Sequence, residues 1–195
     1  MKLRMVIPIQ IAVIGLLGAI YYGYHAVKGP DPDARPEPAS RTATASPSPL
    51  PKVKTTRLVS KKGGFAVGVP DTVMGKKVGP TVTMTTADKV LSVLVGPIQS
   101  GKISVGTDAF MRGMKKAYTD VKVTSTEAPT VDGHKAKAIY GRATNEKKVR
   151  ITFVNVVVKA ETRNYVINAF TAADSDPLFV VPRVNAVIDT FEVVK

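Results

Sequence analysis

The stretch "KAKAIYGRATNEKKVRITFVNVVVKAETRNYVINAFT", residues 135 to 171, decides the fold class. It holds three runs rich in β-branched and aromatic residues, at Lys135–Ala143, Val149–Lys159 and Tyr165–Thr171, and such runs are typical of strands. Short polar turns, "NEKK" and "ETRN", join the runs and leave no room for a crossover helix. We therefore predict an antiparallel meander rather than a doubly wound parallel sheet.

The segments around the meander add further strands and two helices. The additional strands are predicted at Gly64–Val69, Val82–Thr86, Val90–Val95 and Val121–Thr126. A first helix, capped by Thr107, has one apolar face made of Phe110, Met111, Met114, Ala117 and Tyr118. A second helix, begun by Asp176-Pro177 or by Pro182, has its apolar side at Val184, Val187, Ile188 and Phe191. The predicted class is α+β, a central antiparallel sheet with helices packed on it.

The N-terminus predicts a membrane anchor. Residues 1–4 contain two cations, which favour a cytoplasmic N-terminus, and residues 5–24 carry no formal charge. A helix of about 20 residues just spans a bilayer core of roughly 30 Å. We therefore expect a single-pass signal anchor with the rest of the chain outside the cell membrane. The alternative is secretion after signal cleavage, although the end of the run offers no good small-x-small cleavage site.

Two features lie in and after the predicted anchor. A stripe of small residues, Gly15, Ala19 and Gly23, suits either a weak homodimer contact or ordinary membrane packing. Residues 25–56 are rich in proline, serine and threonine and predict a disordered, semi-stiff linker. The compact domain is expected over residues 57–195.

The charge of the chain points to anionic partners. The net charge is +13, and residues 57–195 contribute +9 of it, from 21 basic and 12 acidic side chains. Four lysine pairs form a possible polyanion-binding set: Lys61, Lys62, Lys76, Lys77, Lys115, Lys116, Lys147 and Lys148. The same lysines would also keep turns solvated and protect sheet edges. Nucleic acid is not expected, because the domain is predicted to be external and few aromatic residues accompany the pairs.

One segment, "GPIQSGK", has the glycine and lysine spacing of a phosphate-binding loop, at Gly96, Gly101 and Lys102. A working loop of that kind needs serine or threonine directly after the lysine and a helix that starts there. Ile103 occupies that position, and the helix is expected to begin only near Thr107. We predict no nucleotide site.

No other set of residues predicts catalysis or metal binding. His134 is the single histidine of the domain, expected at the exposed start of a strand, and the chain has no cysteine. Asp174 and Asp176 resemble the start of a calcium loop, but Pro177 interrupts the series, and helix capping by Asp176 explains them better. We predict a protein that is not an enzyme and has no cofactor. A hydrolase using His134 with a serine or an aspartate is the one catalytic alternative.

Both edges of the domain resemble a known family. "GGFAVGVPDTV", Gly63 to Val73, resembles the opening of PsbP-like domains, and "NYVINAFTAADSDPLFVVPRVNAVIDTFEV", Asn164 to Val193, resembles their ending. The resemblance implies an α/β/α sandwich around a central antiparallel sheet. It also implies kinship with the LpqN-type envelope proteins of actinobacteria, whose fold is mostly non-catalytic and acts through protein contacts.

These observations give two expectations for function. The first is a membrane-anchored, extracytoplasmic binding module that contacts another cell-envelope protein. The second is an electrostatic module that holds anionic wall polymer or lipid head groups through its lysine pairs.

Overall fold

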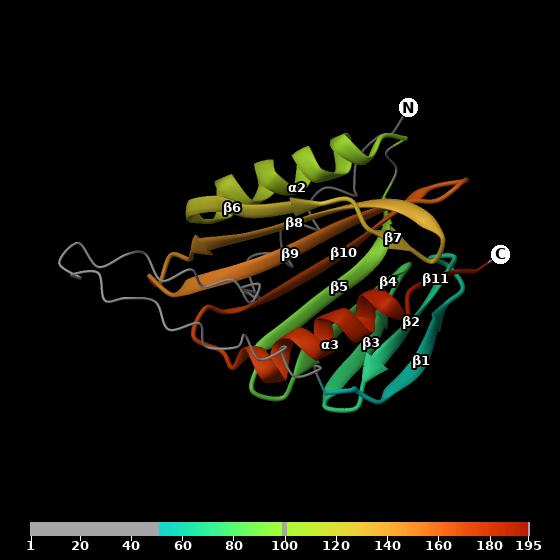
Figure 1. Ribbon diagram of the computed structural model, residues 1–195, viewed down its shortest axis with the longest axis horizontal. Helices are drawn as coiled ribbons and strands as arrows, with labels where there is room; N and C mark the ends of the chain where they lie inside the picture. Colours follow the sequence, from blue (N-terminus) through green and yellow to red (C-terminus); the bar gives the residue numbers. More distant parts are fainter. Residues whose placement is uncertain (1–50, 99–100, 195) are drawn as a thin grey trace, which may run out of the picture.

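The computed structural model describes residues 51–98 and 101–194 (Figure 1). The strands are β1 (Thr55–Ser60), β2 (Phe65–Pro70), β3 (Val73–Val78), β4 (Thr81–Thr86), β5 (Leu91–Ile98), β6 (Thr119–Glu127), β7 (Thr130–Val131), β8 (His134–Thr144), β9 (Arg150–Lys159), β10 (Asn164–Ala172) and β11 (Glu192–Val193). The helices are α2 (Ile103–Ala117) and α3 (Pro177–Asp189). The predicted membrane helix, its small-residue stripe and the linker up to residue 50 lie outside the described residues.

Antiparallel pairing organises the strands. β10, β9, β8 and β6 are hydrogen-bonded in that order, β7 pairs with the start of β8, and β3, β4 and β5 form a second run. β5 lies alongside β10, so the two runs continue into one twisted surface (Figure 1). A smaller sheet, in the order β1, β2 and β11, packs beside β3. The meander of β8, β9 and β10 predicted from residues 135 to 171 is confirmed.

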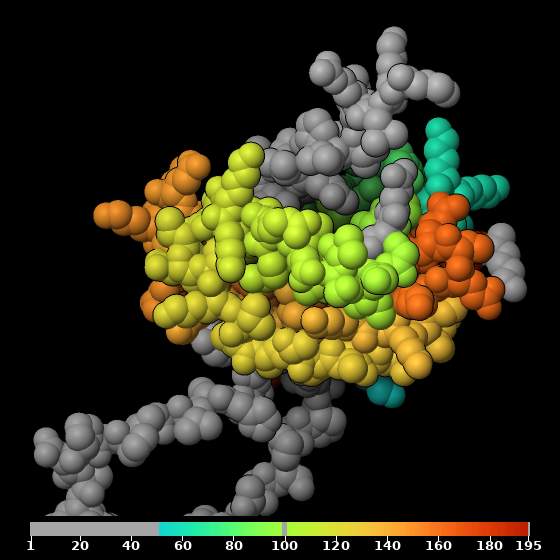
Figure 2. Space-filling model, turned by 90° about the horizontal axis from the view of Figure 1, so that it is seen from above, coloured from blue at the N-terminus to red at the C-terminus, as the bar shows by residue number. Residues whose placement is uncertain are grey.

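The helix α2 covers one face of the meander (Figures 1 and 2). Its apolar side places Phe110 and Met114 against Phe153 of β9 and Phe170 of β10, with ring centroids of Phe110 and Phe153 5.5 Å apart. Alternate residues of a strand point to opposite faces, so only every second residue of β9 and β10 meets α2. The apolar face predicted for this helix is confirmed.

The other face of the meander is covered by α3 together with the small sheet. Phe65 of β2, Tyr165 of β10 and Phe191 after α3 form an aromatic cluster, with ring centroids 5.3 to 5.9 Å apart. Edge-on and offset ring contacts of this kind add to the stabilisation from burial. The outer layer on this side is therefore part helix and part sheet, which refines the purely helical layer expected of an α/β/α sandwich.

The start of α2 differs from the prediction. The helix begins at Ile103, four residues before the expected cap, and Lys102 is the N-cap residue without a side-chain cap bond. Thr107 lies inside the helix, where its hydroxyl donates to the Ile103 carbonyl at 3.3 Å, a bond that satisfies a buried threonine. The late start given as one argument against a phosphate-binding loop was therefore wrong. The argument from Ile103, which lacks a hydroxyl for magnesium, is unaffected.

The start of α3 follows one of its two predicted signals. Asp176 is the N-cap, and its carboxylate accepts a hydrogen bond from the Leu178 N–H at 2.9 Å. Pro177 is the first helical residue, where a missing N–H costs nothing. Pro182 lies within the helix and is buried, so it does not mark the start.

Four short strands were not predicted: β1, β3, β7 and β11. β3 reads "VMGKKV" and β1 reads "TTRLVS", and neither has a regular alternation of apolar and polar residues. β7 and β11 contain two residues each and exist only through their partners β8 and β2. Within the described ranges, neither helix is both long and apolar enough to cross a bilayer.

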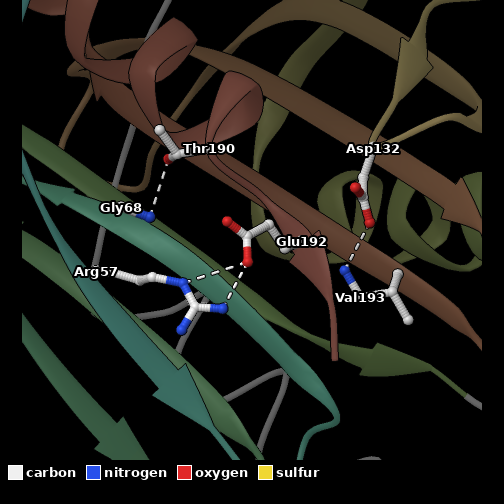
Figure 3. Close-up of polar contacts among 6 residues, drawn as sticks. All are labelled: Arg57, Gly68, Asp132, Thr190, Glu192 and Val193. Carbon is white, nitrogen blue, oxygen red and sulfur yellow. Dashed lines mark hydrogen bonds and ion pairs between the residues drawn. The ribbon is translucent and has the colours of Figure 1, made fainter. Parts of the chain in front are cut away.

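Polar contacts fasten the C-terminal strand (Figure 3). The Arg57 guanidinium of β1 donates to Glu192 of β11, with Nη2 2.6 Å from Oε2, and the two side chains reach across β2. The Gly68 N–H donates to the Thr190 hydroxyl at 2.9 Å, and the Val193 N–H donates to the Asp132 carboxylate at 2.7 Å. The last strand is therefore bonded to the first strand and to the β7–β8 turn at once.

Packing in the sheet beneath α2 makes Gly141 of β8 a position where we expect a larger side chain to destabilise the fold. A Cβ atom there would meet the ring of Phe153 and would lie 2.5 Å from the Lys122 carbonyl oxygen of β6. We expect Gly141→Ala to lower the free energy of unfolding by about 2 kcal/mol, because overpacking a close contact typically costs that much. Urea denaturation of the full chain measures the change. Gly101→Ala is the control, since nothing lies within 4 Å of its added Cβ, and an equal loss in both variants would contradict the packing account.

The contact of Arg57 with Glu192 predicts a pH effect on stability. The hydrogen bond from Arg57 lowers the pKa of Glu192 below its ordinary value of 4.5. A lowered pKa in the folded state means that the contact stabilises the fold above that value and stops doing so as the pH falls through the folded pKa. Glu192→Gln should therefore lower the urea midpoint at pH 7 and leave it equal to that of the original chain well below pH 4.5. Glu146→Gln, in an exposed turn, is the control, and a difference that persists at low pH would contradict the assignment.

Candidate functional site

Several turns meet at one end of the sheets, which we call the Gly63 end. It comprises the β1–β2 turn with Gly63, the β3–β4 turn with Gly79 and Pro80, the β9–β10 turn at residues 160–163, the β7–β8 turn with Asp132, and β11. The Ser60 hydroxyl donates to the Pro80 carbonyl at 3.0 Å, which joins the first two turns. The Tyr165 hydroxyl donates to the Gly64 carbonyl at 2.8 Å, which joins the first and third. The turns therefore form one connected surface.

Local chemistry explains why the chain takes this path. Gly64 has a φ of +70°, in the left-handed region that suits glycine, and its N–H donates to the Ser60 carbonyl at 2.8 Å. A Cβ on Gly63 would clash with the Pro80 carbonyl oxygen. Burial raises the pKa of Tyr165, which keeps its hydroxyl protonated as a donor, while the Arg163 charge acts in the opposite direction.

Basic side chains surround this end, and we call six of them the basic rim. The basic rim consists of Lys61, Lys62, Lys77, Lys135, Lys159 and Arg163, all exposed. Lys77 Nζ donates to the Val59 carbonyl of β1 at 3.3 Å, and Arg163 Nη1 lies 3.5 Å from the Gly63 carbonyl oxygen in the β1–β2 turn. Lys135 and Lys159 flank the paired residues Ala136 and Val158 on neighbouring strands.

The acidic side chains are distributed differently. The turns and strand ends of the Gly63 end carry four acids, Glu127, Asp132, Glu161 and Glu192. Asp132 already accepts the Val193 N–H, and Glu192 already accepts the Arg57 guanidinium. The opposite end, which we call the Asn145 end, carries six acids in its turns and strand ends: Asp71, Asp88, Asp120, Glu146, Asp174 and Asp176. These acids alternate with basic residues, which include Lys89, Lys115, Lys116, Lys147, Lys148 and Arg150, so the charges at this end offset one another. Strands lie about 4.8 Å apart, less than the screening length of about 8 Å at physiological ionic strength. Lys135 and Lys159 lie on neighbouring strands, so their charges are within the screening length of each other and reinforce each other.

The structure separates the four predicted lysine pairs into two groups. Lys61-Lys62 and Lys76-Lys77 lie in or near the turns of the Gly63 end. Lys115-Lys116 ends α2 and Lys147-Lys148 lies in the β8–β9 turn, and both belong to the Asn145 end. β9 connects the two ends with 10 residues, which span about 30 Å at roughly 3.3 Å each. The two groups are too far apart to hold one small ligand together.

Sequence reasoning missed half of the basic rim. Lys135, Lys159 and Arg163 are single basic residues, so a search for adjacent lysines passes over them. Their signal was their position, since Lys159 and Arg163 flank the "ETRN" turn and Lys135 starts the strand that pairs with β9. Pairing two strands of known register brings such terminal residues together.

The remaining candidates have structural roles in the described residues. His134 begins β8 as predicted, and its Nε2 lies 4.0 Å from Asp132 Oδ2, the oxygen that also accepts the Val193 N–H. This contact belongs to the fastening of β11. Among residues 51–98 and 101–194, no three histidine, aspartate or glutamate side chains come together as a metal-binding group.

Comparisons with known proteins identify the fold. No protein-family model matches the sequence, and no curated protein matches it. The solution structure of cyanobacterial PsbP (CyanoP) from Synechocystis sp. PCC 6803 is similar with a TM-score of 0.53 and 17% identity, over 76% of this chain and 98% of that one. The crystal structure of LpqN, involved in cell envelope biogenesis of Mycobacterium tuberculosis, is similar with a TM-score of 0.51 and 16% identity, over 73% of this chain and 92% of that one. The chain therefore has the PsbP-like fold that CyanoP and LpqN share, as the resemblance of its two edges predicted.

Proposed function

We propose that this protein is a non-catalytic binding module of the cell envelope. In this proposal residues 5–24 anchor it, the domain lies outside the cell membrane, and the basic rim contacts an acidic surface of another envelope protein. The observation that carries the proposal is the excess of six exposed basic side chains over four acids, Glu127, Asp132, Glu161 and Glu192, at the Gly63 end. Similarity in fold to LpqN, a protein involved in cell envelope biogenesis, supports the location.

The rigidity of the Gly63 end favours a protein partner. The turns that carry the basic rim are joined by the bond from Ser60 to Pro80 and the bond from Tyr165 to Gly64. The backbone of these turns is held in one geometry and so loses little conformational freedom on binding, which favours a partner of matching shape. Complementary charge then raises the association rate and selects the partner.

A second candidate function is electrostatic binding of anionic wall polymer or lipid head groups. The exposure of the basic rim favours it, because a flexible polyanion needs accessible charges rather than a shaped surface. Its affinity would fall steeply with salt, since exposed charges are screened. The two candidates share a site and differ in the partner.

Crosslinking separates them. The full chain is produced in three forms in cells with an intact envelope, and its contacts are captured by crosslinking. The first form is the original chain. The rim variant has Lys61, Lys62, Lys135 and Lys159 changed to glutamine, and the matched variant has Lys115, Lys116, Lys147 and Lys148 changed to glutamine. The rim variant keeps the turn contacts of Lys77 and Arg163. We expect a discrete protein adduct with the original and the matched variant and at least a tenfold weaker adduct with the rim variant, because both variants lose four charges but only one loses them at the Gly63 end.

Two outcomes contradict the proposal. An adduct of equal strength in the rim variant would remove the basic rim from the contact. The absence of a protein adduct, together with salt-sensitive co-sedimentation of the detergent-solubilised chain with purified anionic wall polymer, would favour the second candidate.

A further inference from the structure

The strand β3 is an open edge of the sheet. Within the described residues its backbone pairs with β4 alone, in an unbroken register from Val73 opposite Thr86 to Val78 opposite Thr81. Every residue of β3 after Val73 is exposed. An edge strand of this kind presents a row of N–H and C=O groups that a further strand can pair with.

The two faces of β3 differ in character. The side chain of Val73 is buried, and a Cβ added to Gly75 on the same face would lie 2.8 Å from Val69 of β2. Met74, Lys76 and Val78 point to the opposite face, and Met74 and Val78 are 64% and 50% exposed. Along the outer face of this edge, the side chains are therefore apolar at Met74, basic at Lys76 and apolar at Val78.

The other edge of the sheet, β6, is built differently. Its pairing with β8 is interrupted twice, between Thr119 and Lys122 and again between Val123 and Ser125. Such bulges twist an edge and hinder the addition of a strand. β3 has no such interruption in its register with β4. Of the two edges, β3 is the one shaped to accept a strand.

The charges on β3 decide what can pair with it. In a fully overlapping antiparallel pair of two copies of this strand, Lys76 would face Gly75 and Lys77 would face Met74 of the other copy. Lys76 of each copy would then lie diagonally beside Lys77 of the other, within the screening length of about 8 Å, and like charges that close are unfavourable. The lysines therefore oppose self-association at this edge. The same two lysines attract an acidic strand, and Lys77 also belongs to the basic rim.

We propose that an extended acidic segment of a protein partner adds to β3 as a further strand, with a glutamate or aspartate beside Lys76 and apolar residues beside Met74 and Val78. This inference rests on the proposed function and specifies how the partner binds. Main-chain hydrogen bonds to the open edge supply affinity, and the alternating side chains supply selectivity.

A synthetic peptide tests the inference. The probe is the fluorescein-labelled peptide Thr-Val-Thr-Glu-Glu-Val-Thr-Tyr, blocked at both ends, added to the full chain in zwitterionic detergent. We expect saturable binding by fluorescence anisotropy, with the largest changes in amide NMR signals along Val73–Val78. A peptide with N-methylated interior amides should bind at least tenfold more weakly, because it lacks the N–H donors that pair with the edge. A peptide with lysine in place of both glutamates should do the same, because its charge opposes Lys76.

Protein variants locate the site. Lys76→Glu should weaken binding of the acidic peptide at least tenfold, and Lys116→Glu, an equal charge change at the Asn145 end, should leave it unchanged, with both variants keeping the original denaturation midpoint. Equal binding of the N-methylated peptide, amide changes confined to other elements, or no binding of the acidic peptide would each overturn strand addition. None of these results decides whether the basic rim contacts a protein, which the crosslinking experiment measures separately.

Discussion

The packing of Phe65, Tyr165 and Phe191 is the contact on which the rest of the structure depends. These three rings come from the second strand, the meander and the residue before the last strand, so they join the start of the domain to segments about 100 and about 126 residues later in the sequence. Each of the three is almost wholly buried. The Tyr165 hydroxyl extends the same contact into the turns, because it donates to the Gly64 carbonyl. The core and the turns of the Gly63 end thus share one side chain.

The meander was the part of the fold that the sequence could predict. Its strands repeat β-branched residues over long runs, and β9 is buried on both faces, so local pattern and tertiary environment agree. β3 could not be predicted in the same way. Only Val73 of its six residues is buried, and its strand conformation comes from pairing with β4 rather than from its own side chains. The start of α2 was predicted wrongly for a related reason. The helix begins at Ile103 without a capping side chain on Lys102, so the sequence carries no local signal for its start.

Three of the six residues of the basic rim could be predicted from the sequence, because they belong to lysine pairs. Adjacent lysines were easy to find, but proximity along the chain did not predict proximity in space, and two of the four pairs lie about 30 Å from the others by the length of β9. The members that complete the basic rim are single residues at strand ends. They come together because antiparallel pairing returns the chain to the same end after every second strand. The sequence does not show the register between strands, because register depends on the whole sheet, and without it the neighbours of these single residues could not be predicted.

The direction of β1 fixes the end of the domain at which the chain enters it. β1 enters the fold at the Asn145 end, where Thr55 pairs with Pro70, and runs toward Ser60 at the Gly63 end. Any attachment upstream of Thr55 therefore joins the domain at the pole opposite the basic rim. The basic rim therefore lies about 30 Å, the length of β9, from the end at which the described chain enters the domain.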